Sequence, residues 1–192
     1  LEQHIQDRNS VRLEPMTLGG SEIRVRVKKK GLDIDLHNAS SSVRQLAPLL
    51  LYLRYWASRN DLLIIDEPEM NLHPESQAKL LEVFGIMVNL GVRILITTHS
   101  PYLLAHLNNL ISGAPDNPEI LREQAGCMYL KDPRAFLSPE DVSAYEMREN
   151  KLHSLKDEDY GIRWDTLSDV SSDIQQKYFE IYEKEEKSPE ED

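Results

Sequence analysis

The sequence has a single cysteine, Cys127, so it cannot form a disulfide within the chain. One free thiol fits a reducing compartment such as the cytoplasm. No apolar run approaches the roughly 18 residues that a membrane-spanning helix needs. The first residues, LEQHIQDRNS, also lack the basic and then apolar layout of a signal peptide. We therefore expect a cytoplasmic protein with no membrane segment.

An initiator methionine is missing too, since the sequence begins with Leu1, and we expect a segment of a longer protein. Its 192 residues suit one domain with a tail. Positive charge is scarce in the second half, where residues 101–192 carry 10 Lys and Arg against 21 Asp and Glu. A general affinity for nucleic acid is not expected there. Residues 1–60 carry 10 against 6, which leaves a local phosphate or nucleic-acid contact open.

The first half of the sequence has clear apolar patterns. Alternating apolar residues over residues 22–36, on both sides of KKKG, predict a β-hairpin with Gly31 in the turn. A Ser-rich segment follows, and residues 43–58 then have the pattern of a helix, which one of the serines at 40–42 can cap. Pro48 lies inside this helix and is expected to kink it.

Two short apolar runs, residues 62–66 and 92–98, show no alternation, which is typical of strands buried on both faces of a parallel sheet. Between them, residues 73–91 predict an amphipathic helix with Pro74 at its start. Another helix is expected after Ser100. The order strand, helix, strand, helix predicts a βαβ unit and hence an α/β fold.

The pattern weakens after residue 111. Residues 127–133 and 141–147 are candidate strands. Residues 167–187 predict a helix whose apolar face holds Val170, Ile174, Tyr178 and Ile181. We expect three parts: a first lobe (1–111), a C-terminal extension of the same domain (112–184), and an acidic disordered tail (185–192).

Asp66 and Glu67 directly follow the first apolar run, in LLIIDEP. Two adjacent carboxylates at the end of a buried strand repel each other and lose hydration unless a cation is bound. An apolar strand that ends in Asp-Glu is the Walker B pattern of nucleoside triphosphatases, in which the Asp holds Mg²⁺ and the Glu polarises the attacking water. Alone, the motif fits a strand end that caps the next helix better.

Three further features favour a nucleotide site. THS at 98–100 ends the next strand, where His99 can donate to a γ-phosphate, although alone it fits a capping or core histidine. MNLHPE follows DEP at the spacing of a D-loop. The Ser-rich turn opens a helix about twenty residues before Asp66, where backbone N–H groups can bind an anion, although alone it fits a simple helix cap.

Taken together, these motifs resemble the ABC-type ATPase family over roughly residues 23–110. The stretches LLIIDEPEMNLHPESQ and ILITTHSPYLL carry the resemblance. They look closest to the branch with SMC-type repair proteins, OLD-family ATPases and AAA-like ATPases of bacterial phage-defence systems. The resemblance implies the C-terminal portion of a P-loop NTPase, an ABC-type head in which helices flank parallel strands. It also implies ATP and Mg²⁺ as cofactors, and a homodimer that holds two nucleotides between two heads.

The resemblance implies a role for each matching residue. The catalytic centre would contain Asp66 as Mg²⁺ ligand, Glu67 as catalytic glutamate and His99 as switch histidine. The signature turn, which contacts the nucleotide of the opposite subunit, would contain Ser40, Ser41 and Ser42. The D-loop would contain Asn71, Leu72 and His73. The signature departs from the usual Ser-x-Gly, because Ser42 replaces the glycine and its Cβ would crowd a phosphate.

The family's P-loop, Gly-x-x-x-x-Gly-Lys-Ser/Thr, has no match in this sequence. The two glycines of TLGGSE, residues 17–22, have no Lys-Ser/Thr after them, and we interpret that stretch as a turn. We expect the P-loop to lie upstream in the same protein or on a separate chain. The isolated chain is then expected to have negligible ATPase activity, whereas the whole protein hydrolyses ATP.

Two other functions stay open at this point. One is a non-catalytic dimerisation or scaffold module, which the missing P-loop and the altered signature favour slightly and the presence of Asp66, Glu67 and His99 together disfavours. An OLD-type nuclease is disfavoured, because KDED at 156–159 follows no apolar strand and so does not match a Toprim domain. The residues after 140 resemble the tails of defence-type ATPases, which act through a separate effector such as a nuclease.

Overall fold

The computed structural model describes residues 9–15, 21–27, 31–113, 117–157, 161–163, 172–180 and 182. Most of the turn expected at residues 17–22 and the whole acidic tail at 185–192 lie outside these residues. Residues 172–180 form a helix, within the longer helix expected at 167–187. Val170 and Ile181, two members of its expected apolar face, lie outside the described residues. No helix in the described ranges is both long and apolar enough to cross a membrane.

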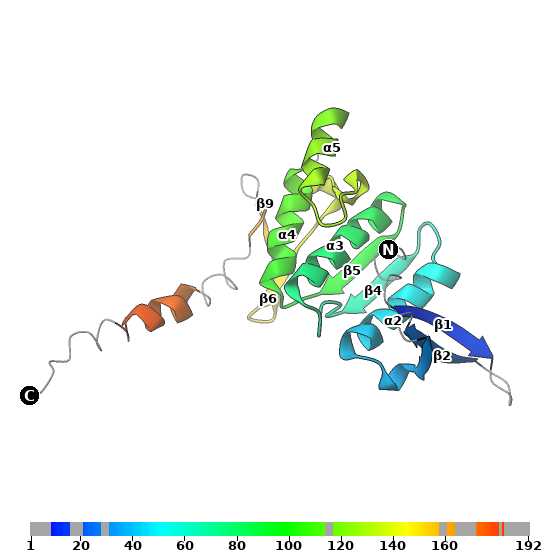
Figure 1. The fold of residues 1–192 in the computed structure, drawn as a ribbon. Helices are drawn as coiled ribbons and strands as arrows, with labels where there is room; N and C mark the ends of the chain where they lie inside the picture. The colour runs from blue at the N-terminus through cyan, green and yellow to red at the C-terminus, as the bar shows by residue number, and fades with distance from the viewer. Residues whose placement is uncertain are drawn as a thin grey trace, which may run out of the picture.

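The N-terminal part is an antiparallel sheet of β1 (Asn9–Pro15), β2 (Ser21–Val27) and β3 (Leu32–Asp35), in that order. Strand β1 was not expected from the sequence; it pairs with β2 so that Val11 lies opposite Val25, and both are buried. Gly31 precedes β3 with a φ of 59°, which glycine adopts without steric cost. One face of this sheet packs against a helix (Figure 1).

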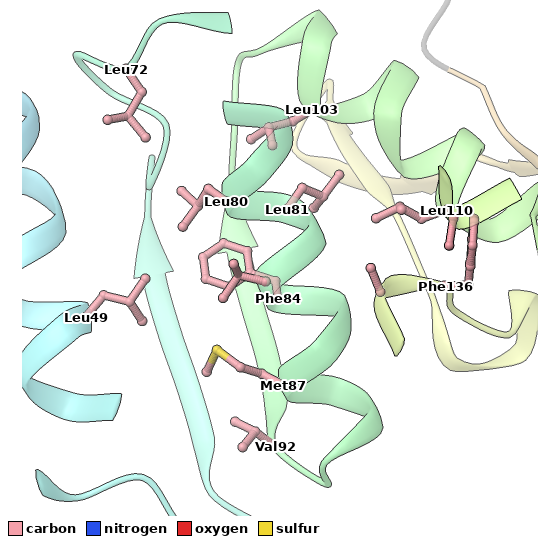
Figure 2. Packing of buried hydrophobic residues seen from close by; sticks show 13 residues of the cluster. Leu49, Leu72, Leu80, Leu81, Phe84, Met87, Val92, Leu103, Leu110 and Phe136 are labelled. Carbon is pink, nitrogen blue, oxygen red and sulfur yellow. The ribbon is translucent and has the colours of Figure 1, made fainter. Parts of the chain in front are cut away.

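That helix is α2 (Ser41–Tyr55), which follows the short helix η2 (Leu36–Asn38). Two buried residues of α2 one turn apart, Ala47 and Leu51, face the N-terminal sheet. Leu49 belongs instead to the main apolar cluster of the molecule, toward which it points in Figure 2. Helix α2 therefore joins the N-terminal sheet to the rest of the fold.

The centre of the molecule is a βαβ unit of β4 (Leu62–Asp66), α3 (Pro74–Asn89) and β5 (Arg93–Thr97). The two strands are parallel, with a register that runs from Leu62 opposite Arg93 to Asp66 opposite Thr97. Helix α3 lies over one face of the pair, beside α4 (Pro101–Ser112) (Figure 1). The predicted α/β fold with parallel strands and flanking helices is confirmed.

Helix α3 is buried on two sides. Leu80, Phe84 and Met87 point toward the strands, whereas Leu81 points toward Leu110 and Phe136 (Figure 2). On the second side the backbone comes very close, because a Cβ at Gly85 would lie 2.2 Å from the carbonyl oxygen of Ala135. The absence of a side chain at Gly85 allows this contact.

The segment after α4 contains several short elements. They are α5 (Pro118–Gly126), η3 (Pro133–Ala135), η4 (Pro139–Asp141), β6 (Tyr145–Arg148), β7 (Lys151–Ser154), β8 (Lys156–Asp157) and β9 (Gly161–Ile162). Strands β6 and β7 form one antiparallel pair, and β8 and β9 form another. The strand expected at 141–147 begins only at Tyr145.

The strand expected at residues 127–133 is wrong, because these residues form turns and bends that lead into η3. The carboxylate of Glu82 explains the difference. It accepts the backbone N–H of Tyr129 at 3.0 Å and that of Leu130 at 2.7 Å. These amides are therefore satisfied without a neighbouring strand.

The expectation that β4 and β5 are buried on both faces is also wrong. One face, with Leu63, Ile65, Ile94 and Ile96, packs on the main cluster. On the other face Leu62, Ile64 and Leu95 are 55%, 65% and 56% exposed. Helices cover the first face, whereas none of the residues that the structure describes covers the second. We call this second face, with Leu62, Ile64 and Leu95, the open face.

Candidate catalytic site at the ends of strands β4 and β5

Asp66 is the last residue of the open face. Because side chains alternate along a strand, Ile64 and Asp66 of β4 lie on the same face as Leu95 and Thr97 of β5. Asp66 and Thr97 are opposite each other, and the hydroxyl of Thr97 donates to Oδ1 of Asp66. Asp66 is exposed, so its remaining oxygen positions face outward and can accept further ligands.

Glu67 follows with a backbone conformation that is unusual for a residue with a side chain. Its φ is 42°, a strained value for a non-glycine residue. Its N–H donates to the carbonyl and to the hydroxyl oxygen of Thr97, both at 3.2 Å. Its carbonyl accepts Nε2 of Gln45, on α2, at 3.1 Å. Contacts from two other elements thus hold the turn that directs the side chain of Glu67.

His99 comes after β5 and reaches the same place. Its Nε2 lies 3.4 Å from Oε1 of Glu67, and its side chain is 83% exposed. The structure therefore brings His99 to the adjacent residues Asp66 and Glu67, which precede it by more than thirty positions in the sequence. It does so because parallel strands present their carboxyl ends at one edge of a sheet.

A buried polar cluster lies beside this site. Glu69, which is 7% exposed, accepts the hydroxyl of Thr98 and the N–H of His99, the latter at 3.2 Å. Ser100 donates its hydroxyl to Oε1 of Gln77 at 2.6 Å, and its N–H donates to the hydroxyl of Thr98 at 3.0 Å. These contacts attach the loop after β5 to the loop after β4 and to α3.

The Ser-rich turn and the loop after β4 meet within this one chain. The hydroxyl of Ser40 accepts the N–H of Val43 at 3.4 Å and so caps α2. Ser41 is exposed and accepts from Arg44 at 3.4 Å. The hydroxyl of Ser42 donates to the carbonyl of Asn71 at 2.8 Å.

His73 has a different position from the other predicted site residues. Its Nδ1 accepts the N–H of Glu75 at 3.4 Å, which makes it the N-cap of α3. Among the described residues, no hydrogen bond or ion pair connects His73 to Asp66, Glu67 or His99. Asn71 has a φ of 62°, a conformation that asparagine tolerates, and its carbonyl faces Ser42.

Several residues of the site were not identified from the sequence, namely Gln45, Glu69, Gln77, Thr97 and Thr98. Thr97 could have been found, since the parallel register that aligns the two strand ends also places it opposite Asp66. The others act through contacts between residues 22 to 30 positions apart, such as Gln45 with Glu67 and Glu69 with Thr98. Sequence spacing alone gives no signal for such contacts.

The donor set fits Mg²⁺ only if other ligands contribute. Within the described ranges, no group of three or more His, Cys, Asp and Glu side chains is arranged to hold a metal ion. One exposed carboxylate with a hydroxyl beside it is nevertheless suited to Mg²⁺, which keeps several waters and binds through one or two carboxylates plus phosphate oxygens. Asp66 therefore fits a metal that arrives with a phosphate ligand.

Comparison with known families places this site in context. Residues 7–105 match the family described as "AAA domain, putative AbiEii toxin, Type IV TA system". The chain belongs to this family. The match contains the whole site, from the Ser-rich turn to His99, and an AAA-type ATPase domain is thereby shown. Residues from 106 onward lie outside the matched segment of the AAA domain.

Other comparisons add little to this assignment. No curated protein matches this chain. Among solved structures, 3 chains match. One comes from work on the ATP-driven dimerisation and DNA-stimulated activation of SMC ATPases; it has a TM-score of 0.48 and 12% sequence identity, over 88% of this chain and 83% of that chain.

Proposed function

We propose that this chain supplies the metal-binding and water-activating part of an ATP hydrolysis site. The observation that carries the proposal is the meeting of Asp66, Glu67 and His99, with 3.4 Å between Glu67 and His99, at the joint end of two parallel strands. Its AAA-domain family supports the same conclusion. A bound Mg²⁺–ATP would supply the phosphoryl group and the charge neutralisation that its transfer requires.

Each of the three side chains has a distinct task in this proposal. Asp66 would hold the metal through its exposed oxygen positions, and the hydroxyl of Thr97 fixes the orientation of its carboxylate. Glu67 accepts the proton of the attacking water as general base. His99 donates a hydrogen bond to the phosphate group that is transferred, and its high exposure leaves the ring free to do so.

The open face supports a composite site. Asp66 and Thr97 end a face on which three large apolar side chains are more than half exposed. The sequence contains no P-loop. We propose that a P-loop-bearing segment outside these 192 residues packs on the open face and brings the phosphates to Asp66. The isolated chain would then bind and hydrolyse ATP negligibly.

The remaining predicted residues fit a role between two subunits. Exposed Ser41 and the first-turn N–H groups of α2 would meet the nucleotide held by a second copy, with Ser40 and Ser42 shaping the turn. Asn71 and His73 belong to the loop beside it. ATP would then act as the link that joins two heads, and its hydrolysis would release them.

The biological setting is proposed from the family alone. From the sequence we expect a bacterial defence or DNA-maintenance system, and the family description, which names a toxin of a type IV toxin–antitoxin system, favours the first. In that setting the cytoplasmic ATPase would signal to a separate effector, such as a nuclease. The second candidate is a dimerisation scaffold without catalysis, and the missing P-loop together with Ser42 in place of glycine favours it.

The test compares the full-length protein with its Glu67→Gln variant. We expect Mg²⁺-dependent ATP hydrolysis to fall by about a hundredfold or more, because the base is lost while the shape is kept. We also expect the ATP-bound dimer to persist longer, as measured by light scattering. Glu75→Gln is the matched control, since Glu75 is exposed and its carboxylate forms an ion pair with Lys79, one turn along the same helix.

Two outcomes would count against the proposal. If wild-type protein forms an ATP-independent dimer and hydrolyses no ATP, the scaffold function replaces it. If the isolated 192-residue chain shows Mg²⁺-dependent turnover that Glu67→Gln abolishes, the need for an external P-loop is wrong.

A further inference from the structure

Glu69 contacts two consecutive residues, Thr98 and His99. Glu69 lies in the loop between β4 and α3, and the residue is 7% exposed. One oxygen, Oε1, accepts both the hydroxyl of Thr98 and the backbone N–H of His99, the latter at 3.2 Å. A single carboxylate oxygen thus determines where the backbone of His99 lies relative to the loop that carries Glu67.

The other oxygen of Glu69 is buried without a hydrogen-bond partner among the residues that the structure describes. Glu82 differs, because both of its oxygens accept hydrogen bonds, from His106 at 2.9 Å and from two backbone amides. A buried carboxylate that is only partly satisfied lowers stability. A contribution to stability therefore does not explain the carboxylate at position 69.

The loop after β5 is otherwise fixed by Ser100 and Gln77. Ser100 contacts both Thr98 and Gln77, and Nε2 of Gln77 donates to the carbonyl of Leu72 at 3.0 Å. The backbone on both sides of His99 is thus held, whereas its ring is exposed. The side-chain torsion angles of His99 can change, but the position of the backbone that carries the ring depends on Glu69.

We propose that Glu69 is a positioning residue for His99: through Thr98 and the His99 N–H it holds the backbone where the exposed ring reaches Glu67. The carboxylate suits this task because one of its oxygens accepts both hydrogen bonds at once. The placement follows from the contacts of Glu69, whereas its effect on ATP hydrolysis rests on the function proposed above.

The placement is tested first, without nucleotide, by amide hydrogen exchange on the 192-residue chain. Glu69→Ala removes the acceptor, and we expect exchange at the His99 amide to speed up by about tenfold. Glu69→Gln keeps an amide oxygen at the same place and should restore part of the protection, which also covers the case in which Glu69→Ala fails to fold. Glu75→Gln should leave the His99 amide unchanged. Equal exchange in wild type and both Glu69 variants overturns the proposal.

The catalytic consequence is tested in the full-length protein by combining Glu69→Gln with His99→Ala. If Glu69 acts through His99, each single variant lowers kcat, and the double variant is no slower than His99→Ala alone. Rate losses that multiply in the double variant overturn the positioning role. A wild-type protein without ATPase activity instead contradicts the proposed function, and the exchange experiment then still decides the placement of His99.

Discussion

The two faces of the β4–β5 pair both carry large apolar side chains, but their surroundings are very different. Leu63 and Ile94 face α3 and the main cluster, whereas their neighbours Leu62 and Leu95 are more than half exposed. The covered face holds the fold together. The open face ends in Asp66 and leads to the predicted chemistry. Stability and proposed function thus lie on opposite sides of the same two strands.

The two buried glutamates show the same division. Glu82 is 0% exposed, and three groups contact its two carboxylate oxygens: the ring of His106 and the backbone amides of Tyr129 and Leu130. Glu69, near the site, uses one oxygen and leaves the other without a partner in the described part of the chain. Both carboxylates are buried, but only that of Glu82 has hydrogen-bond partners on both oxygens.

The largest expected effect is on the covered side. Glu82→Ala leaves His106 and the amides of Tyr129 and Leu130 without their acceptor inside the protein. We expect the free energy of unfolding to fall by about 3–5 kcal/mol, measured by urea denaturation of the 192-residue chain. Glu75→Ala, at an exposed site on the same helix, is the control and should have little effect. If Glu82→Ala lowers the free energy of unfolding no more than the control does, Glu82 has no structural role of this kind.

Much of the fold could be predicted because local signals and the structure agree. Ser40, Ser100 and the prolines at positions 74 and 101 start helices as their types suggest. The closeness of Glu67 and His99 followed from the rule that parallel strands end at one edge. These predictions depend on residues that are close in sequence or on the topology of one βαβ unit.

The wrong predictions concern segments whose structure depends on contacts with residues far away in the sequence. Residues 127–133 have the apolar composition of a strand, but the carboxylate of Glu82, almost fifty positions away, binds their amides. The exposure of Ile64 and Leu95 could not be predicted either. An unbroken apolar run indicates that a strand is suited to burial on both faces. Which segments cover each face depends on the rest of the fold.

A pair of neighbouring substitutions tests the difference between the two faces directly. In the isolated chain, Ile94→Ala should cost about 2 kcal/mol, because Ile94 packs on the main cluster. Leu95→Ala should change the free energy of unfolding by less than about 0.5 kcal/mol, as an exposed position does. Urea denaturation measures both. Equal losses would mean that the open face is covered in solution, for example by a second copy of the chain.

The smallest expected effect concerns the carboxylate at the other end of β4. Asp61 precedes the strand, and its Oδ2 accepts the hydroxyl of Tyr52 at 2.7 Å and the N–H of Ser58 at 2.9 Å. These hydrogen bonds, that of Tyr52 first, lower the pKa of Asp61 below its ordinary value. Unlike Asp66 at the opposite end of the strand, Asp61 is engaged within the fold and serves stability.

A lowered pKa in the folded state means that ionised Asp61 stabilises the protein above the pKa of the unfolded chain, about 3.9. That contribution is lost as the pH falls through the still lower pKa of the folded state. The urea midpoint of wild type should therefore exceed that of Asp61→Asn at pH 7, and the gap should narrow from about pH 5 downward. Comparing the two proteins at each pH cancels the titration of other carboxylates. A gap that stays constant down to pH 3 would show that the two hydrogen bonds do not depend on the charge of Asp61, and the contrast between the two ends of β4 would then be one of position alone.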